Sequence, residues 1–363
     1  MLVPAPARLF LTFWVVFTSA ALCGVSLWAF NPPPDAEIIP LLGHPGFIAS
    51  ANTVAGSLYH NPFKAEGSGV APFAINTNPA LIANNQRFSF DLGYTGIFAG
   101  GNDSGSAHFI HAGALFPTRM GGLAFGVQFN FGELGSFLLG KTVLAHTGFG
   151  KDITQNLYVG AALSGGLNSN GQSGGTGGND DWAFYGKIGF VYRLPDAGPL
   201  LEPSAALVLS GLGKTFNTLD EFSAFPSIVT PQAGFSATVL STRNFKAGFS
   251  LDLSFPSAQN IVIDTGLQAE IAQVFLVSAG YQVNVSEAAA AKEMHWPFIG
   301  ISYNFTANTE RSRMLAARGW LQNDMRISGV WESRASGNQL MSAGAVVNMG
   351  NGAAQAPQII IED

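Results

Sequence analysis

The sequence is poor in charge and almost free of cysteine. Only 11% of its 363 residues are Asp, Glu, Lys or Arg, which is less than half of the usual share of about 25%. The net charge is −6, and because no basic block occurs, nucleic acid is not expected as a partner. Beyond the N-terminal stretch no apolar run approaches the roughly 20 residues of a membrane-spanning helix, which excludes a helical membrane protein.

Glycine and aromatic residues are abundant instead. The chain holds 44 Gly and 29 Phe, and 47% of its residues are hydrophobic. A disordered chain would be poor in aromatic residues and rich in charge, and a collagen would need glycine at a strict period. The composition therefore indicates a folded chain of one or two domains.

The N-terminus has the pattern of a secretory signal. Arg8 precedes an apolar stretch that runs to Ala29 and ends in small residues, as in a cleaved leader. We expect a signal peptide over residues 1–29, with Ser26 as the alternative cleavage position. A retained membrane anchor and a lipoprotein modified at Cys23 are the alternative interpretations. Because Cys23 is the only cysteine, the cleaved chain would have no thiolate for a disulfide or a metal.

Alternation of apolar and polar residues is the main signal in the rest of the chain. From Leu123 to Phe131 every second residue is Leu, Phe or Val, and the residues between them are small or polar. Successive side chains of a strand point to opposite faces, so this segment predicts a strand with one apolar and one polar face. The pattern recurs over residues 88–95, 245–255, 261–271 and 299–305.

Two all-β architectures contain such strands. In a soluble sandwich the apolar face is the core, whereas in a transmembrane barrel it meets lipid and the polar face lines the lumen. The segments are long enough for a tilted crossing of a bilayer, and aromatic residues lie near many of their ends, as in an interfacial girdle. The second face carries residues that suit a wet lumen, namely Lys246, Asp252, Asp264, Gln268 and Glu270. These features favour the barrel, which leaves no strand edge unpaired in lipid.

We therefore predict a transmembrane antiparallel β-barrel of about 14 strands. The predicted strands lie near residues 86–98, 106–116, 120–132, 136–149, 154–166, 181–193, 202–214, 230–240, 243–255, 260–271, 273–285, 297–306, 325–333 and 339–348. The last pair has an alternative, because the barrel could end at Phe305. Residues 307–363 would then form a periplasmic tail with a short helix near residues 313–321.

The chain is expected to have three parts after the signal peptide. Residues 30–85 form an N-terminal plug, residues 86–349 the outer-membrane barrel, and residues 350–363 a periplasmic tail. The first part is too long for a simple leader, and the lumen of so wide a barrel would otherwise be open. Long connections, such as residues 168–181 and 215–230, are expected on the outer side of the membrane and short turns on the periplasmic side.

Short matches to catalytic motifs have simpler explanations. Gly135, Gly140, Lys141 and Thr142 match the phosphate-binding loop, but apolar residues fill the loop and the segment continues as a strand, whereas the motif must open a helix. We expect Lys141 to face the lumen instead. The six histidines show no helical pairing with a carboxylate that would suit zinc. We expect no enzyme activity, no metal and no cofactor.

The element Asn78-Pro79-Ala80, just before the first predicted strand, resembles the plug region of the long-chain fatty acid outer-membrane transporters. This FadL-like superfamily also includes the type IX secretion shuttle protein and a group of uncharacterised spirochaete outer-membrane barrels. Residues 264–281 and 297–305 resemble later strands of the same family. The resemblance implies a 14-stranded barrel that an N-terminal segment plugs, with Asn78, Pro79 and Ala80 in the plug.

The same resemblance implies a function and a location in the bacterial outer membrane. The function would be passive uptake of long-chain fatty acids or other hydrophobic small molecules. A predicted loop would supply an outer ligand groove with Phe216, Leu219, Phe222 and Phe225. A surface or secretion-associated docking barrel and a general porin are the alternatives. The expected partners are outer-membrane lipid, the hydrophobic ligand and the barrel assembly machinery.

Overall fold

The computed structural model describes most of the predicted barrel and part of the predicted plug. The described residues are 53–58, 70–85, 87–100, 105–134, 137–169, 180–214, 229–256, 260–285, 297–306, 323–333 and 338–349. The predicted signal peptide and the predicted tail after residue 349 lie outside them.

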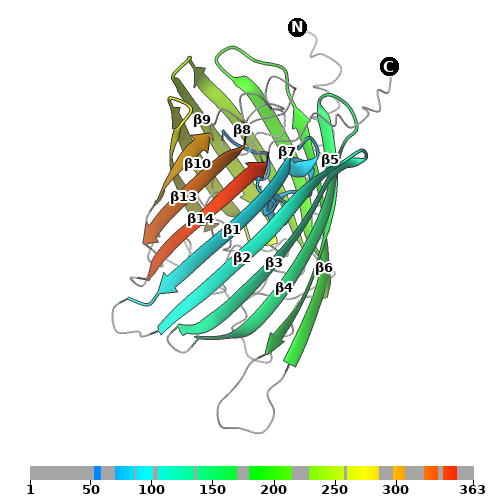
Figure 1. Ribbon diagram of the computed structural model, residues 1–363, viewed down its shortest axis with the longest axis vertical. Helices are drawn as coiled ribbons and strands as arrows, with labels where there is room; N and C mark the ends of the chain where they lie inside the picture. The colour runs from blue at the N-terminus through cyan, green and yellow to red at the C-terminus, as the bar shows by residue number, and fades with distance from the viewer. Residues whose placement is uncertain are drawn as a thin grey trace.

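Fourteen antiparallel strands form a closed barrel (Figure 1). Each strand pairs with its neighbours in the sequence, and β14 pairs with β1 from Phe88 opposite Met349 to Phe98 opposite Gln339. The strands are β1 (Phe88–Phe98), β2 (Gly105–Thr118), β3 (Gly121–Leu134), β4 (Phe137–Asp152), β5 (Leu157–Ser169), β6 (Asp180–Arg193), β7 (Leu201–Lys214), β8 (Thr230–Ser241), β9 (Phe245–Ser254), β10 (Val262–Ile271), β11 (Phe275–Asn284), β12 (Phe298–Thr306), β13 (Asp324–Ser333) and β14 (Gln339–Met349). The predicted strand count is confirmed. The alternative in which the barrel ends at Phe305 is wrong, because β13 and β14 complete the ring.

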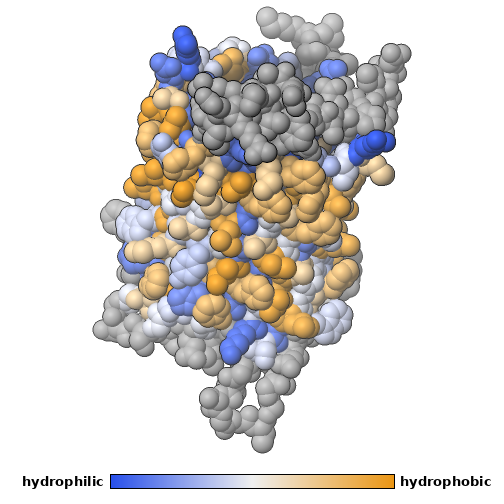
Figure 2. All heavy atoms as spheres, in the orientation of Figure 1, coloured by the Kyte–Doolittle hydropathy of each residue, from blue (hydrophilic) through white to orange (hydrophobic). Residues whose placement is uncertain are grey.

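The two faces of each strand are distributed as the alternation predicts. On β3, Phe125 and Phe129 point outward and are 46% and 45% exposed, whereas Gln128 and Asn130 point inward and are buried. Apolar side chains predominate over the middle of the outer face in view (Figure 2). An apolar outer face is the opposite of a soluble sandwich, so that alternative is wrong, and the closed apolar wall is that of a transmembrane barrel.

Both ends of the barrel have short and long connections, but most of the short turns lie at one end. Short turns join strands at the end where β1 begins and β14 ends, the upper end in Figure 1: residues 119–120, 153–156, 242–244 and 272–274. The long connections between β5 and β6 and between β7 and β8 leave from the opposite end. Both are among the connections that the sequence predicts to be external.

Residues 53–58 and 70–85, which we call the luminal segment, lie inside the barrel. The segment contains a short helix, α3 (Ala74–Thr77), and a 3₁₀ turn, η2 (Pro79–Ile82). Its side chains form one hydrophobic core with inward-facing residues of the wall, and Phe73, Ile75, Leu81 and Ile82 are fully buried. In the described part of the chain no helix has the length and apolar character needed to cross a membrane.

Candidate functional site

Inward-facing glycines form the surface on which the luminal segment rests. We call Gly122, Gly148, Gly150, Gly160 and Gly189 the glycine track; they lie on the neighbouring strands β3 to β6. A Cβ on Gly148 would lie 2.9 Å from the Cβ of Ile75, and one on Gly160 would overlap the backbone of Pro79 and Ala80. Real Cβ atoms do not approach so closely, so the wall lacks side chains where the segment contacts it.

Asn78 is the central polar residue of the luminal segment. Its side-chain oxygen accepts a hydrogen bond from the backbone N–H of Ala80 at 3.0 Å, which caps η2 in the manner usual for Asn. Pro79 follows at the first position of the turn, where the missing N–H costs nothing. Asn78 also donates to the carbonyl oxygen of Val54 at 2.7 Å. The Asn-Pro-Ala element is thus a cap that also ties the two described parts of the segment together.

Side chains of the wall satisfy backbone groups of the segment. The Phe73 N–H donates to Asp91 Oδ2 at 2.8 Å, and the Val54 N–H donates to Asp252 Oδ2 at 2.7 Å. The Leu58 N–H donates to Gln268 Oε1 at 2.9 Å. Buried backbone groups need such partners. Asp252 and Gln268 face the lumen as predicted, but they are buried against the segment and not exposed to water.

Two further interactions fix the middle of the segment and the residue that leads from it into β1. Lys187 on β6 donates from Nζ to the carbonyl oxygen of Asn76. Just before β1, Arg87 forms a buried ion pair with Asp324 on β13. Asp324 also accepts from Asn348 on β14 at 2.6 Å. The chain therefore passes from the segment into β1 at the point where the ring closes.

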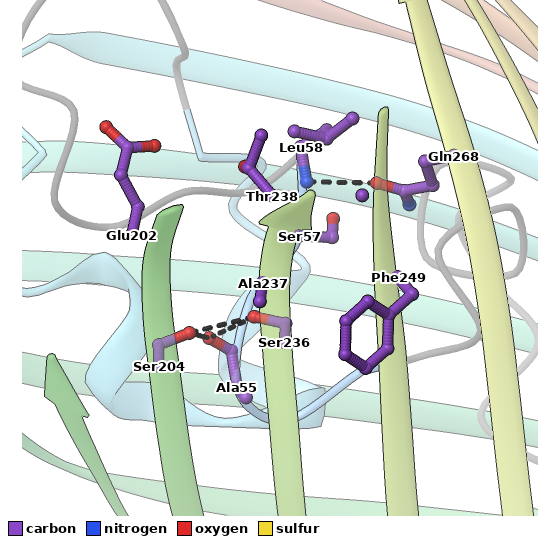
Figure 3. A pocket seen from close by; sticks show the side chains of 11 residues that line it. Ala55, Ser57, Leu58, Glu202, Ser204, Ser236, Ala237, Thr238, Phe249 and Gln268 are labelled. Atoms are coloured by element: carbon purple, nitrogen blue, oxygen red, sulfur yellow. Dashed lines mark hydrogen bonds between the residues drawn. The ribbon is translucent and has the colours of Figure 1, made fainter. Parts of the chain in front are cut away.

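A small pocket lies between the segment and β7 to β10 (Figure 3). Ser204 donates to the carbonyl oxygen of Ala55 at 2.8 Å and lies 2.8 Å from the hydroxyl of Ser236. The enclosed space is about 10 Å³, close to the minimum that one water molecule needs. The segment packs closely against β7 to β10 here, and the space left between them is too small for a solute larger than water.

The predicted site residues have different outcomes. Asn78, Pro79 and Ala80 lie inside the barrel and are buried. The predicted groove residues, Phe216, Leu219, Phe222 and Phe225, lie outside the described residues.

The match to a phosphate-binding loop is part of a strand. Lys141 and Thr142 lie in β4, and Thr142 is buried and points inward. The expectation that Lys141 faces the lumen is wrong: it is exposed and shares the outward parity of Val143. Within the described residues no three His, Cys, Asp or Glu side chains gather as metal ligands would.

Sequence reasoning missed the wall residues that bind the segment, above all Asp91, Lys187 and the glycine track. The sequence did contain a signal for the glycine track. Gly148, Gly150 and Gly160 share the inward parity of polar residues on their strands, and repeated glycine on one face of a strand is typical where another backbone approaches closely.

No family model matches the chain, and no curated protein matches it. Among solved structures it is similar to a TodX deltaS2 mutant, described as a monoaromatic hydrocarbon channel, at 11% identity and a TM-score of 0.49, covering 85% of this chain and 99% of that one. It is also similar to the Pseudomonas putida toluene transporter TodX, at 12% identity and a TM-score of 0.45, over 82% and 99% of the two chains. A Pseudomonas aeruginosa FadL homologue is similar at 10% identity and a TM-score of 0.42, over 85% of this chain and 97% of that one. The similarity concerns the barrel fold alone.

Proposed function

We propose that this chain is an outer-membrane channel for hydrophobic small molecules and that the luminal segment is the plug that closes it. The observation that carries the proposal is the seam between segment and wall. Residues 75–83 of the segment fit against the glycine track. Backbone N–H groups elsewhere in the segment are bonded to wall side chains, and the space beside residues 55–58 is only water-sized. A channel built in this way must move its plug to open.

The apolar core inside the barrel supports passage of a hydrophobic solute. The core inside the barrel joins Phe73 and Ile75 of the segment to Leu115, Val191 and Val346 of the wall. When the segment shifts, these apolar side chains would line the space that opens. Apolar solutes bind in largely apolar, enclosed pockets, whereas ions and sugars need polar or water-filled paths. Long-chain fatty acids are one class that such a path would admit.

The two rival functions predict different behaviour. A general porin needs an open, polar lumen, and the buried segment opposes that arrangement. A docking barrel would keep its plug permanently in place and would pass no solute.

Uptake by intact cells tests the proposal. The protein would be produced in a bacterial strain that lacks its own fatty acid transporter, and entry of radiolabelled oleate, decan-1-ol and the hydrophilic sugar raffinose would be compared at equal protein levels. We expect saturable entry of at least one of the two apolar probes and no entry of raffinose. Raffinose entry would identify a porin. Entry of none of the three would leave a barrel without transport, and both results overturn the proposal.

A further inference from the structure

A polar patch lies on the inner wall beside the luminal segment, on strands β2 to β5. We call His111, Gln128, Thr142, His146 and Asn168 the amide–imidazole patch. His111 lies directly opposite Gln128 in the pairing of β2 with β3, and Thr142 lies opposite Asn168 in the pairing of β4 with β5. All five side chains point inward and are at most 7% exposed, so they form one contiguous surface on neighbouring strands.

Each member of the patch presents one buried polar atom that has no hydrogen-bond partner. Eleven such atoms occur in the described part of the chain, and five of them are His111 Nδ1, Gln128 Oε1, Thr142 Oγ1, His146 Nε2 and Asn168 Oδ1. Buried polar groups in folded proteins are nearly always paired. A concentration of exceptions on one surface therefore points to a ligand that pairs with them.

Bonds at their other polar atoms hold three of these side chains in place. Gln128 donates from Nε2 to Asn130 Oδ1 at 2.8 Å. His146 Nδ1 lies 2.8 Å from the hydroxyl of Ser164, and His111 Nε2 lies 3.0 Å from Asp91 Oδ1. One polar atom of each side chain is fixed by a bond and the other is buried without a partner, so the orientation that a ligand would meet is already set.

Apolar side chains adjoin the patch. Leu144, inward-facing on β4 between Thr142 and His146, forms a buried cluster with Ala183 and Tyr185. At the border with the luminal segment the ring of Phe73 packs edge-on against His111, with ring centroids 4.6 Å apart. A solute on this surface would meet hydrogen-bonding groups beside an apolar floor.

We propose that the amide–imidazole patch binds the hydroxyl group of a small neutral solute, whose apolar body packs against Leu144. The inference rests on the proposed function and names the class of its solute. Gln128 Oε1 and Asn168 Oδ1 only accept hydrogen bonds, whereas the Thr142 hydroxyl can also donate. A hydroxyl group can donate to either of the two acceptors and accept from the Thr142 hydroxyl. A carboxylate would face the carbonyl oxygens of Gln128 and Asn168, which only accept hydrogen bonds, and a hydrocarbon would leave every atom unpaired.

Binding of three probes with the same ring tests the proposal. Cyclohexanol, cyclohexane and cyclohexanecarboxylate would be equilibrated by dialysis against the purified, refolded protein in detergent, with detergent alone as the blank. We expect saturable binding of cyclohexanol that is about tenfold tighter than that of either other probe, because one to two hydrogen bonds separate them. Equal binding of cyclohexane, or tighter binding of the carboxylate, overturns the proposal.

Variants locate the binding. Thr142→Val and Asn168→Leu each remove one unpartnered atom, and each should weaken cyclohexanol binding by about fivefold without lowering the melting temperature. Thr95→Val is the matched control, since its buried hydroxyl is already bonded to Ser342 at 2.6 Å, and it should bind cyclohexanol as the parent does. Patch variants that bind like the parent overturn the assignment.

The same preparations separate this inference from the proposed function. Large ion conductance of the intact barrel would contradict a plugged channel and leave the binding result standing. A closed barrel that does not bind cyclohexanol would contradict the site alone.

Discussion

The side-chain amide of Asn78 donates to the carbonyl oxygen of Val54 at 2.7 Å. This bond joins parts of the luminal segment that are 24 residues apart. Val54 is in turn bonded to Asp252 on β9, whereas Asn78 lies against Gly189 on β6. One side chain therefore connects the parts of the luminal segment that contact β9 and β6.

Replacement of Asn78 should loosen the luminal segment. Asn78→Ala leaves the buried Val54 carbonyl without this partner and uncaps η2, and the two losses together should cost about 2 kcal/mol of segment stability. The rate at which thermolysin cleaves the segment in the folded barrel would measure the change. Asn78→Ser keeps a capping oxygen and loses the amide donor to Val54, so its cleavage rate should be intermediate. Cleavage of Asn78→Ala at the parent rate would contradict the role of the bond.

The glycine track should tolerate no side chain. In Gly160→Val the new atoms would overlap the backbone of Pro79 and Ala80, and overpacking of this kind costs about 1 to 3 kcal/mol. We expect displacement of the segment and release of a small trapped dye from proteoliposomes.

Gly165 on the same strand provides the control for Gly160. A Cβ there meets its nearest neighbour at an ordinary 3.7 Å, so Gly165→Val should retain the dye. Equal leakage from both variants would show that the effect is not due to the segment.

The barrel was predictable because its signal is local. Alternation along each strand, as in Phe125 to Asn130, assigns every residue to lipid or lumen, and the bilayer imposes that pattern on all strands. Whether β13 and β14 complete the ring was harder to predict. Closure pairs β14 with β1, which is far away in the sequence, and no local pattern of residues indicates such a pairing.

The contact between the luminal segment and the wall was predictable only in part. The family resemblance drew attention to the Asn-Pro-Ala element, but its capping role is visible only in the structure. The partners of the segment were not predictable, because Asp91 and Asp252 lie on distant strands and an inward carboxylate suits a wet lumen as well as a buried bond. Only the three-dimensional arrangement decides between the two environments.

A cross-link between segment and wall should lock the channel. A Cβ on Gly248 would lie 3.1 Å from Leu58 Cγ, and in a disulfide each sulfur lies about 3 Å from the Cβ of the other cysteine. With Cys23 replaced by Ser, oxidised Leu58→Cys/Gly248→Cys should lose entry of the apolar probe that the parent admits, and reductant should restore it. Leu58→Cys alone is the control. Undiminished entry through the oxidised form would mean that this part of the segment does not move.

The outer face should reject charge near mid-membrane. Leu267 lies near the middle of β10 and is 66% exposed. Leu267→Arg should destabilise the inserted barrel by about 2 to 4 kcal/mol, which urea titration of the protein in lipid vesicles would measure. Met120 is 72% exposed in the turn between β2 and β3, and Met120→Arg should be nearly neutral. Equal costs for the two would contradict the placement of the membrane.

Ion conductance across a planar bilayer tests the central claim, that the luminal segment closes the barrel, most directly. The measurement would compare the intact protein with a variant that lacks residues 30–85, after both have been shown to fold by their shift in gel mobility on heating. The plugged barrel predicts a silent intact protein and large, steady pores from the deletion variant. Large pores from the intact protein, or none from the folded deletion variant, would contradict it.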